Sequence, residues 1–320
     1  MKKIFSISII LLVTLLLLPL SVLNLEQENT PVLPTVNQNK PSTSAENPNT
    51  IKVLMHETEK IEEMPVEDYL LGVVAGEMPA LYEKEALKAQ TVCAYTFMLW
   101  RQKANNDKDY DITDDYTTDQ CFVPIETARE RWGSHADEYT EKIKSAINEV
   151  KFQKLTYNGE TILSVYHSLS SGKTESAKNV WGKDYPYLQA VASVDDVLAT
   201  NYTSTVTIAP EQIASALSLT ANEVIQNGFA DITRTESGTV KTLKIGAKEF
   251  KGSEIRKALD LKSSNFEIAN KDGSFTFTVY GYGHGVGMSQ NGANCMAKQG
   301  FTYEEILKHY YTGCQIIRNS

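Results

Sequence analysis

The chain has 320 residues, a formal charge of −9 at pH 7 and 42% hydrophobic residues. This length is enough to bury a sizeable core in one or two domains. The acidic balance, and the lack of a basic run after the first residues, argue against a protein that binds nucleic acid in bulk. We therefore expect no nucleic-acid partner.

The N-terminus predicts a membrane anchor. Lys2 and Lys3 precede an uncharged apolar run over residues 4–23, about long enough to cross the hydrocarbon core of a bilayer. Lysines before such a span favour a cytoplasmic N-terminus. We predict a cytoplasmic start and an uncleaved transmembrane signal anchor over residues 1–25. A cleaved signal peptide is the alternative, although no clear small-residue cleavage site follows the run.

Residues 26–50 are polar and rich in Pro, Asn, Ser and Thr. Such a segment buries too little apolar surface to fold alone, so it predicts a flexible linker. We expect residues 51–320 to form an extracytoplasmic domain, and we predict from the motifs described below that it is catalytic. A tether from the membrane suits an enzyme whose substrate is an insoluble polymer nearby.

The domain is expected to start with a strand at residues 51–54 and a helix over residues 66–76. Pro79 breaks the chain soon afterwards and places Glu77 near the helix end. Glu77 stands between apolar runs, and desolvation raises the pKa of a carboxyl, as a general acid near neutral pH requires. A solvent-exposed carboxylate at the helix end is the alternative.

A second long helix, over residues 83–103, is apolar on most sides and is expected to be central. The polar segment 105–119 is predicted to be a solvated surface loop, with a place in the cleft as the alternative. An apolar stripe over residues 139–150 predicts a third helix. A hairpin follows over residues 154–168, with its turn at Asn158-Gly159.

The second strand of this hairpin is predicted to end at a polar loop. Glycine permits tight turns close to a ligand, and the neighbouring side chains offer donors and acceptors suited to sugar hydroxyls and N-acetyl groups. The candidate substrate-binding residues are Tyr166, His167, Ser168, Ser171, Gly172, Lys173 and Thr174. An ordinary transition from hairpin to loop is the alternative.

Residues 200–270 predict an inserted lobe. Its expected elements are short helices at 211–217 and 221–228, strands at 238–246 and 248–252, a helix capped by Ser253, and a hairpin over 266–281 that turns at Asp272-Gly273. The hairpin leads into the glycine-rich segment 281–293, GYGHGVGMSQNGA, which presents His284 and Gln290. A helix near 293–299 and a last helix with a Thr302/Glu305 capping box close the chain. This mixture predicts an α+β fold, with two lobes around a cleft.

The four cysteines are Cys93, Cys121, Cys295 and Cys314. Cys295 and Cys314 are candidates for a disulfide in an extracytoplasmic compartment, whereas Cys93 lies in an apolar helical pattern and is expected to be a small buried residue. Cys121 and His135 are too few for a local four-ligand zinc site. We therefore expect no metal and no other cofactor.

Three segments resemble, in the same order, those of the stage II sporulation protein D family. They are MPVEDYLLGVVAGEMPA with EALKAQTV (residues 64–92), residues 166–181 and residues 282–313. The family is known as peptidoglycan lytic transglycosylases. The resemblance implies that Glu77 is the catalytic acid and base, and that the polar loop, His284 and Gln290 bind substrate or support Glu77.

The residues fit a reaction that uses a single carboxylate. Glycoside hydrolases normally use two carboxylates, whereas a lytic transglycosylase uses one, and no second carboxylate stands in a comparable motif. The resemblance implies cleavage of glycan strands denuded of stem peptides, with 1,6-anhydro products, during engulfment in sporulation. It implies as partners the amidase and the membrane protein of that machinery, stage II sporulation proteins P and M. It also implies a place on the mother-cell membrane, facing the septal or intermembrane space.

One position departs from the family pattern. Tyr95 stands where the family usually has an arginine, so we place Tyr95 in the substrate-binding set with reduced affinity or turnover expected. A non-catalytic cell-wall-binding module that enhances an amidase is the alternative function. A zinc hydrolase is a third and more distant one, because the ligand spacing is missing.

Overall fold

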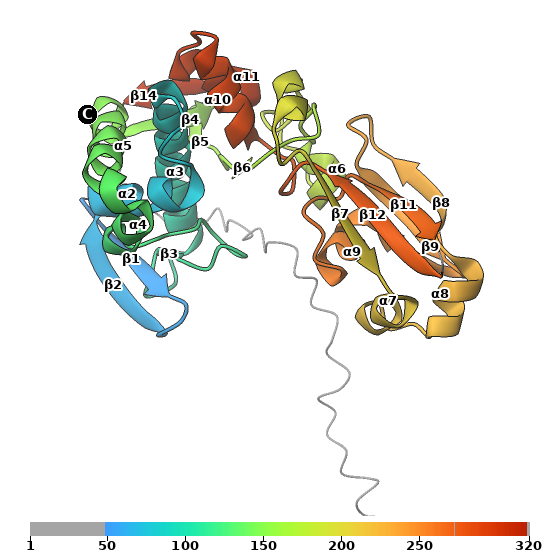
Figure 1. The fold of residues 1–320 in the computed structure, drawn as a ribbon. Coiled ribbons are helices and arrows are strands. Elements are labelled where there is room, and N and C mark those ends of the chain that lie inside the picture. Colours follow the sequence, from blue (N-terminus) through green and yellow to red (C-terminus); the bar gives the residue numbers. More distant parts are fainter. Residues whose placement is uncertain (1–48, 272, 319–320) are drawn as a thin grey trace, which may run out of the picture. The chain divides into compact units, whose positions relative to one another are not determined.

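The computed structural model describes residues 49–271 and 273–318, which form a mixed α+β fold with several small sheets (Figure 1). The helices are α2 (Val66–Glu77), α3 (Lys84–Ala104), α4 (Ile125–Trp132), α5 (Ala136–Val150), α6 (Ala177–Trp181), α7 (Pro210–Ala216), α8 (Ala221–Asn227), α9 (Gly252–Ala258), α10 (Gln290–Lys298) and α11 (Tyr303–Tyr310), with 3₁₀ turns η2 (Gly133–His135) and η3 (Val194–Leu198). The strands are β1 (Thr50–Met55), β2 (Lys60–Pro65), β3 (Ile112–Thr113), β4 (Gln153–Tyr157), β5 (Glu160–Thr161), β6 (Tyr166–His167), β7 (Thr203–Ile208), β8 (Ala230–Arg234), β9 (Val240–Ile245), β10 (Lys248–Lys251), β11 (Phe266–Lys271), β12 (Ser274–Tyr280), β13 (Met288–Ser289) and β14 (Gln315–Arg318).

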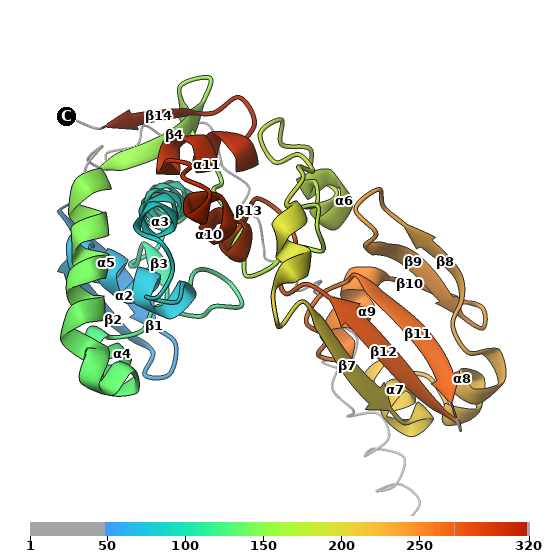
Figure 2. The ribbon, with the colours of Figure 1, turned by 45° about the horizontal axis from the view of Figure 1, so that its top comes forward.

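Helix α3 is the centre of the first hydrophobic core, as its apolar pattern predicts. It packs against α2, α5, α10, α11 and β4, which surround it in Figure 2. Leu87, Val92 and Met98 on α3 have no exposed surface, and Cys93 is equally buried. A helix that is apolar on most sides is stable only when neighbours cover it on most sides.

The predicted hairpin is only partly formed. Strands β4 and β5 pair antiparallel, and Asn158 and Gly159 both have positive φ angles, as a two-residue hairpin turn requires. The second strand ends early, however, at Thr161. The Ser164 hydroxyl donates a hydrogen bond of 2.8 Å to the Cys93 carbonyl of α3, which draws the chain away from β4. Strand β6 then pairs parallel with β13, which lies far away in sequence.

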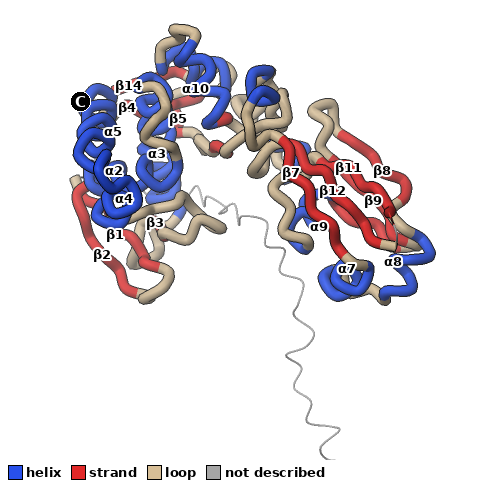
Figure 3. The backbone as a smooth tube through the Cα atoms, viewed as in Figure 1, coloured by secondary structure: helices blue, strands red, loops and turns tan. Residues whose placement is uncertain are grey.

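Residues 203–280 enclose a second hydrophobic core. It forms between the sheets β11-β12-β7 and β10-β9-β8 and the short helices α7, α8 and α9 (Figure 3). Phe266, Phe277, Leu243 and Ile255 are fully buried in it. The expected strands β9 and β10, the two helices before them and the β11/β12 hairpin are present, while Asp272 of the predicted turn lies outside the described residues.

Several helix starts differ from expectation. Lys251, not Ser253, is the residue before α9. Helix α10 begins at Gln290 rather than at residue 293, because the Ser289 hydroxyl accepts a hydrogen bond of 3.1 Å from the Gly292 N–H and caps the helix. The capping box predicted at Thr302 is confirmed at the start of α11.

The prediction that residues 105–119 form only a solvated loop is wrong. Ile112 is fully buried in β3, which pairs parallel with β1. At the end of the segment the buried Asp119 carboxylate forms an ion pair with Arg101 of α3. The polar composition of the segment hides these two buried anchors.

The predicted transmembrane anchor and nearly all of the predicted linker lie outside the described residues. No helix of residues 49–271 and 273–318 is both long and apolar enough to span a bilayer. All four cysteines lie in these ranges and are free, so the Cys295–Cys314 disulfide is not formed.

Candidate functional site

Glu77 is the last residue of α2, and two glycines of that helix determine what lies beside it. Gly72 and Gly76 are one turn apart and face the segment 121–123. A Cβ atom at Gly72 would lie 2.4 Å from the Phe122 ring, so only glycine permits this close approach. The Val123 N–H donates to the Gly72 carbonyl at 3.2 Å. The segment is therefore held along the helix, next to the Glu77 carboxylate.

Three hydrogen-bonding groups converge on the Glu77 carboxylate. The backbone N–H of Cys121 donates to Oε1 at 2.7 Å, and Nε2 of Gln290 lies 3.4 Å from Oε2. The Tyr166 hydroxyl is the third group. Burial raises the pKa of Glu77, while the hydrogen bonds that its carboxylate accepts from Cys121 and Gln290 partly lower it. The site is thus built around a carboxyl that holds its proton more firmly than an exposed glutamate does.

The position of Glu77 at the C-terminal end of α2 also raises its pKa. Unpaired carbonyl groups at a helix C-terminus carry partial negative charge and disfavour a nearby carboxylate. Within the described residues, the Glu77 carboxyl group contacts neither a second carboxylate nor a cation. A partly exposed carboxyl with a raised pKa and no charged neighbour in contact is suited to donate a proton.

Gln120 fixes the direction of the hydrogen bonds behind Tyr166. Its Nε2 donates to the Ala94 carbonyl at 3.3 Å and to the Tyr69 hydroxyl at 2.9 Å. A carbonyl can only accept, so the amide orientation follows and Oε1 must be the group that accepts from the Tyr166 hydroxyl, at 2.8 Å.

This orientation has a consequence for Glu77. The hydroxyl of Tyr166 has one proton, and that proton is directed to Gln120. Toward Glu77 the Tyr166 oxygen therefore offers a lone pair, which a protonated carboxyl can use and a carboxylate cannot. Asp119, the residue before Gln120, is anchored by its ion pair with Arg101. The network thus favours the acid form of Glu77.

Gln290 is the first residue of α10, which is why its side chain reaches the end of α2. It is 5% exposed, and its Nε2 lies 3.4 Å from Oε1 of Gln90 as well as from Glu77. Nε2 of Gln90 is buried and has no hydrogen-bond partner within the described residues. Both contacts of Gln290 are long for hydrogen bonds, so its N–H groups can still donate to another acceptor close to the Glu77 carboxyl group.

The two histidines are held in place as neutral rings. Nδ1 of His167 bonds to the Val286 carbonyl at 3.2 Å, and Nδ1 of His284 accepts from the Val286 N–H at 3.0 Å. Burial lowers the pKa of His167 to about 4 and that of His284 well below its ordinary value. The His284 ring also lies against Trp181, with centroids 5.2 Å apart. Their positions fit a structural or polar contact role and not that of a cationic group at neutral pH.

The polar loop divides into a buried and an open part. Thr174 is fully buried, and its side chain bonds to the backbone of Val191. Ser168 accepts a hydrogen bond from the Asn291 N–H through its carbonyl. Gly172 has a φ of 97° that favours glycine, and Ser171 and Lys173 on either side of it are partly exposed.

The structure does not place Tyr95 among the substrate-binding residues, contrary to the prediction. Its side chain is 1% exposed in the middle of α3, with its ring edge-on to Phe152 at 6.0 Å between centroids. It packs in the core and has no surface available for a sugar. The structure brings together Glu77, Tyr166 and Gln290, but not Tyr95.

No group of three or more His, Cys, Asp or Glu side chains in the described ranges could hold a metal ion. Burial, together with the charge of Glu77, raises the pKa of the Cys121 thiol, so that cysteine favours the protonated form, which is a poor metal ligand. His135 stacks on Tyr139 and bonds to Glu138 instead.

Sequence reasoning missed the residues that orient Glu77. Gln120 and the backbone N–H of Cys121 follow an acidic, polar segment that carries no motif, and Tyr69 and Gln90 read as ordinary helix residues. The two glycines of α2 were the available signal, because glycines four residues apart in an otherwise good helix indicate a close approach of another chain segment.

The fold and the site define an α+β protein with a half-buried, proton-holding glutamate at a helix end. A profile of the SpoIID family, described as "Stage II sporulation protein", matches residues 55–157. "Stage II sporulation protein D" of Bacillus amyloliquefaciens is 36% identical over 278 residues, which cover 86% of this chain and 80% of that protein. The protein of the same name from Bacillus subtilis (strain 168) is 34% identical over 317 residues, 96% and 92% of the two chains. The chain belongs to the stage II sporulation protein D family, as its motifs predict.

A more distant relative has a different name. "Amidase enhancer" of Bacillus subtilis (strain 168) is 30% identical over 297 residues, which cover 76% of this chain and 39% of that protein. The similarity therefore extends to longer proteins of which this chain matches only a part.

Proposed function

We propose that the protein is a peptidoglycan lytic transglycosylase that cleaves glycan strands denuded of stem peptides. The observation that carries this proposal is the state of Glu77, a carboxyl whose pKa is raised by burial and whose partner Tyr166 directs its own O–H to Gln120 and so offers a lone pair to the Glu77 proton. A function in sporulation follows from the family.

In the proposed reaction Glu77 donates its proton to the glycosidic oxygen, and the bond to the anomeric carbon breaks. Glu77, now a carboxylate, takes the proton from the 6-hydroxyl of the same sugar. That oxygen bonds to the anomeric carbon and closes a 1,6-anhydro ring. Atoms and charge balance without water, and the acid form of Glu77 is restored.

The surroundings of Glu77 support one carboxylate rather than two. A hydrolase needs a second carboxylate, either as a nucleophile or to activate water, within about 5–10 Å of the first. Asp119, the acidic residue next to Gln120, is already ion-paired with Arg101 and lies behind the amide. After the first proton transfer, the Cys121 N–H and Gln290 remain as donors that stabilise the Glu77 carboxylate.

We also propose that the domain acts outside the mother-cell membrane, tethered by residues 1–25 and the linker, in the septal or intermembrane space. Its partners there would be the amidase and the membrane protein of the engulfment machinery, stage II sporulation proteins P and M. An amidase that removes stem peptides would supply the strands on which this enzyme acts.

The test is a digest of purified denuded glycan strands by the full chain in detergent. We expect 1,6-anhydro-ended products by mass spectrometry, and a loss of rate of about 10²- to 10⁴-fold in Glu77→Gln. Equal product release by Glu77→Gln would show that another residue is the acid.

A non-catalytic role as an enhancer of an amidase is the second candidate, supported by the relative of that name. It predicts that the protein binds strands without cleaving them, and that Glu77→Gln stimulates an amidase as well as the wild type does. Cleavage by the wild type would exclude this role as the only one.

A further inference from the structure

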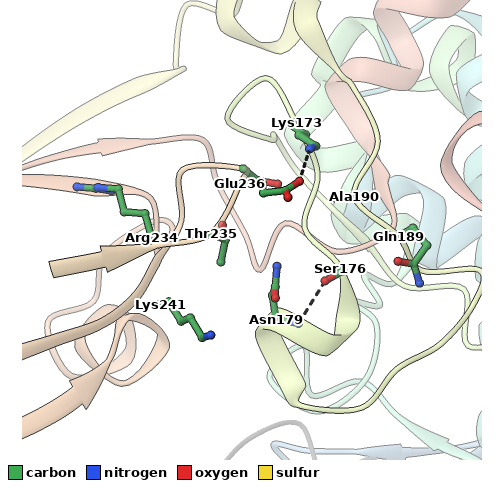
Figure 4. A pocket seen from close by; sticks show the side chains of 10 residues that line it. Lys173, Ser176, Asn179, Gln189, Ala190, Arg234, Thr235, Glu236 and Lys241 are labelled. Atoms are coloured by element: carbon green, nitrogen blue, oxygen red, sulfur yellow. Dashed lines mark hydrogen bonds and ion pairs between the residues drawn. The ribbon is translucent and has the colours of Figure 1, made fainter.

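A polar pocket of ≈ 440 Å³ lies between the loop 173–190 and the β8–β9 hairpin (Figure 4). Lys173, Arg234 and Lys241 line it, and Glu236 is the one acidic side chain among its lining residues. A volume of this size is in the range of pockets that hold small ligands. The chain as a whole carries a charge of −9, so a local excess of cations is contrary to its general balance.

The three cations are incompletely neutralised. The Lys241 side chain forms no ion pair and no hydrogen bond within residues 49–271 and 273–318. The Arg234 guanidinium donates to the carbonyls of Gly238 and Phe266, which satisfies its N–H groups without cancelling its charge.

The ion pair between Lys173 and Glu236 in the pocket is weak. Lys173 and Glu236 are 3.4 Å apart, and the Glu236 side chain is 91% exposed. An exposed pair of this kind contributes little, so a ligand anion can replace Glu236. Figure 4 shows Lys173 and Lys241 extending from opposite sides of the pocket.

Behind the pocket, Glu175 is buried and already paired. Its carboxylate accepts from the Thr235 hydroxyl and from Nδ2 of Asn179. These bonds come from neutral donors and leave the charge of Glu175 in place. The three cations of the pocket therefore stand against two carboxylates, Glu175 and Glu236, and one positive charge remains in excess.

Hydrogen bonds tie the pocket to the glycine-rich segment 281–293, which also carries Gln290, a contact of Glu77. The Ser237 hydroxyl donates to the Thr174 carbonyl at 2.7 Å, and the Glu175 N–H donates to the Gly285 carbonyl at 2.7 Å, next to His284. Lys173 stands seven positions after Tyr166, which contacts Glu77, so the chain between them spans at most about 25 Å. A glycan of a few sugars can bridge such a distance.

We propose that this pocket binds the free carboxylate of a muramic acid residue in a peptide-free glycan strand; the inference rests on the proposed function. In peptidoglycan the stem peptide is attached to muramic acid through an amide of its lactyl carboxyl. Hydrolysis of that amide leaves a carboxylate and removes the bulk of the peptide. A cationic pocket a few sugars from Glu77 therefore recognises the chemical group that distinguishes denuded strands from complete ones.

The test measures strand binding in the Glu77→Gln protein, so that no cleavage interferes. The probes are denuded strands with free carboxylates and the same strands after their carboxylates are converted to methylamides. We expect the free-carboxylate strands to bind about tenfold more tightly, as one well-placed charge-assisted contact allows. In Lys173→Gln/Lys241→Gln this preference should disappear.

Lys257→Gln/Lys271→Gln is the matched control, because it removes the same two charges from exposed positions on α9 and β11, outside the pocket. It should keep the preference. Equal binding of both strands by the unaltered pocket, or an unchanged preference in the double variant, would overturn the proposal. Equal competition by a glycerol-phosphate polymer would show a general anion site instead. Because cleavage by the wild type is measured separately, a failure of this inference is distinguishable from a failure of the proposed function.

Discussion

The polar groups around Glu77 and those of the cationic pocket beside the loop 173–190 differ in how they are paired. The groups around Glu77 are joined by directed hydrogen bonds, whereas the charged groups of the pocket are accessible and weakly paired. Around Glu77 the hydrogen bonds have fixed directions, and the orientation of one amide, Gln120, determines the protonation state that the network favours. In the pocket, Lys241 has no partner among the residues that the structure describes, and Lys173 has a weak one. The comparison indicates that proton transfer depends on buried, directed bonds, whereas recognition depends on accessible charge.

The largest expected effect outside Glu77 itself comes from Gly72→Ala. Alanine normally stabilises a helix by about 1 kcal/mol relative to glycine. Here its Cβ would meet the Phe122 ring at 2.4 Å and the Val123 carbonyl at 2.9 Å, so we expect a net loss of about 1–3 kcal/mol in the free energy of unfolding. Urea denaturation measures it. A stabilised variant would show that the segment 121–123 is not packed against α2.

Gln120→Leu should change the pH profile of the reaction. Without Gln120, the Tyr166 hydroxyl is free to donate to the Glu77 carboxylate, which lowers the pKa of Glu77. A general acid loses activity as pH rises through its pKa, so the alkaline limb should move to lower pH, by about one unit for one hydrogen bond.

The control for this prediction is the double variant with Tyr166→Phe. Since Gln120 acts through the Tyr166 hydroxyl, Gln120→Leu should cause no further shift of the limb in that background. An equal shift in both backgrounds would contradict the directed network and indicate general loosening of the site.

Glu77→Gln is expected to stabilise the protein at alkaline pH. Because burial raises the pKa of Glu77, the folded state favours the neutral carboxyl. Its contribution to stability is complete below the unfolded pKa and is lost as pH rises through the folded pKa. Gln cannot ionise, so the variant should exceed the wild type by about 1 kcal/mol near pH 8 and match it near pH 4. Thermal unfolding at both pH values tests the sign.

The smallest expected effect is that of Ser237→Ala on the β8–β9 turn. It removes the 2.7 Å hydrogen bond to the Thr174 carbonyl and should cost about 0.5–1.5 kcal/mol of stability. It should raise KM for denuded strands and leave the alkaline limb of the pH profile in place. A shifted limb would show that the two regions are not separate in function.

The sequence was informative where a local rule applies. The end of α2 at Glu77, the central α3, the Asn158-Gly159 turn and the Thr302 capping box all follow from periodicity, glycine and caps. The parts of the site that depend on contacts between distant segments could not be predicted from the sequence. Gln120 acts only because Ala94 and Tyr69 orient its amide, and no spacing rule brings these residues together.

Tyr95 shows that a position in a family motif does not determine whether a side chain reaches the surface. Its position in the family pattern suggested a substrate contact, but a tyrosine ring in the apolar surroundings of α3 is more stable in the core, against Phe152. Substitution of a charged residue by an aromatic one can thus change burial as well as chemistry.

The central claim is that Glu77 cleaves glycan without consuming water, and digestion of denuded strands in ¹⁸O-labelled water tests it most directly. The account predicts new ends that contain no ¹⁸O and are lighter than a reducing end by one water molecule. Reducing ends labelled with ¹⁸O would identify a hydrolase and contradict it.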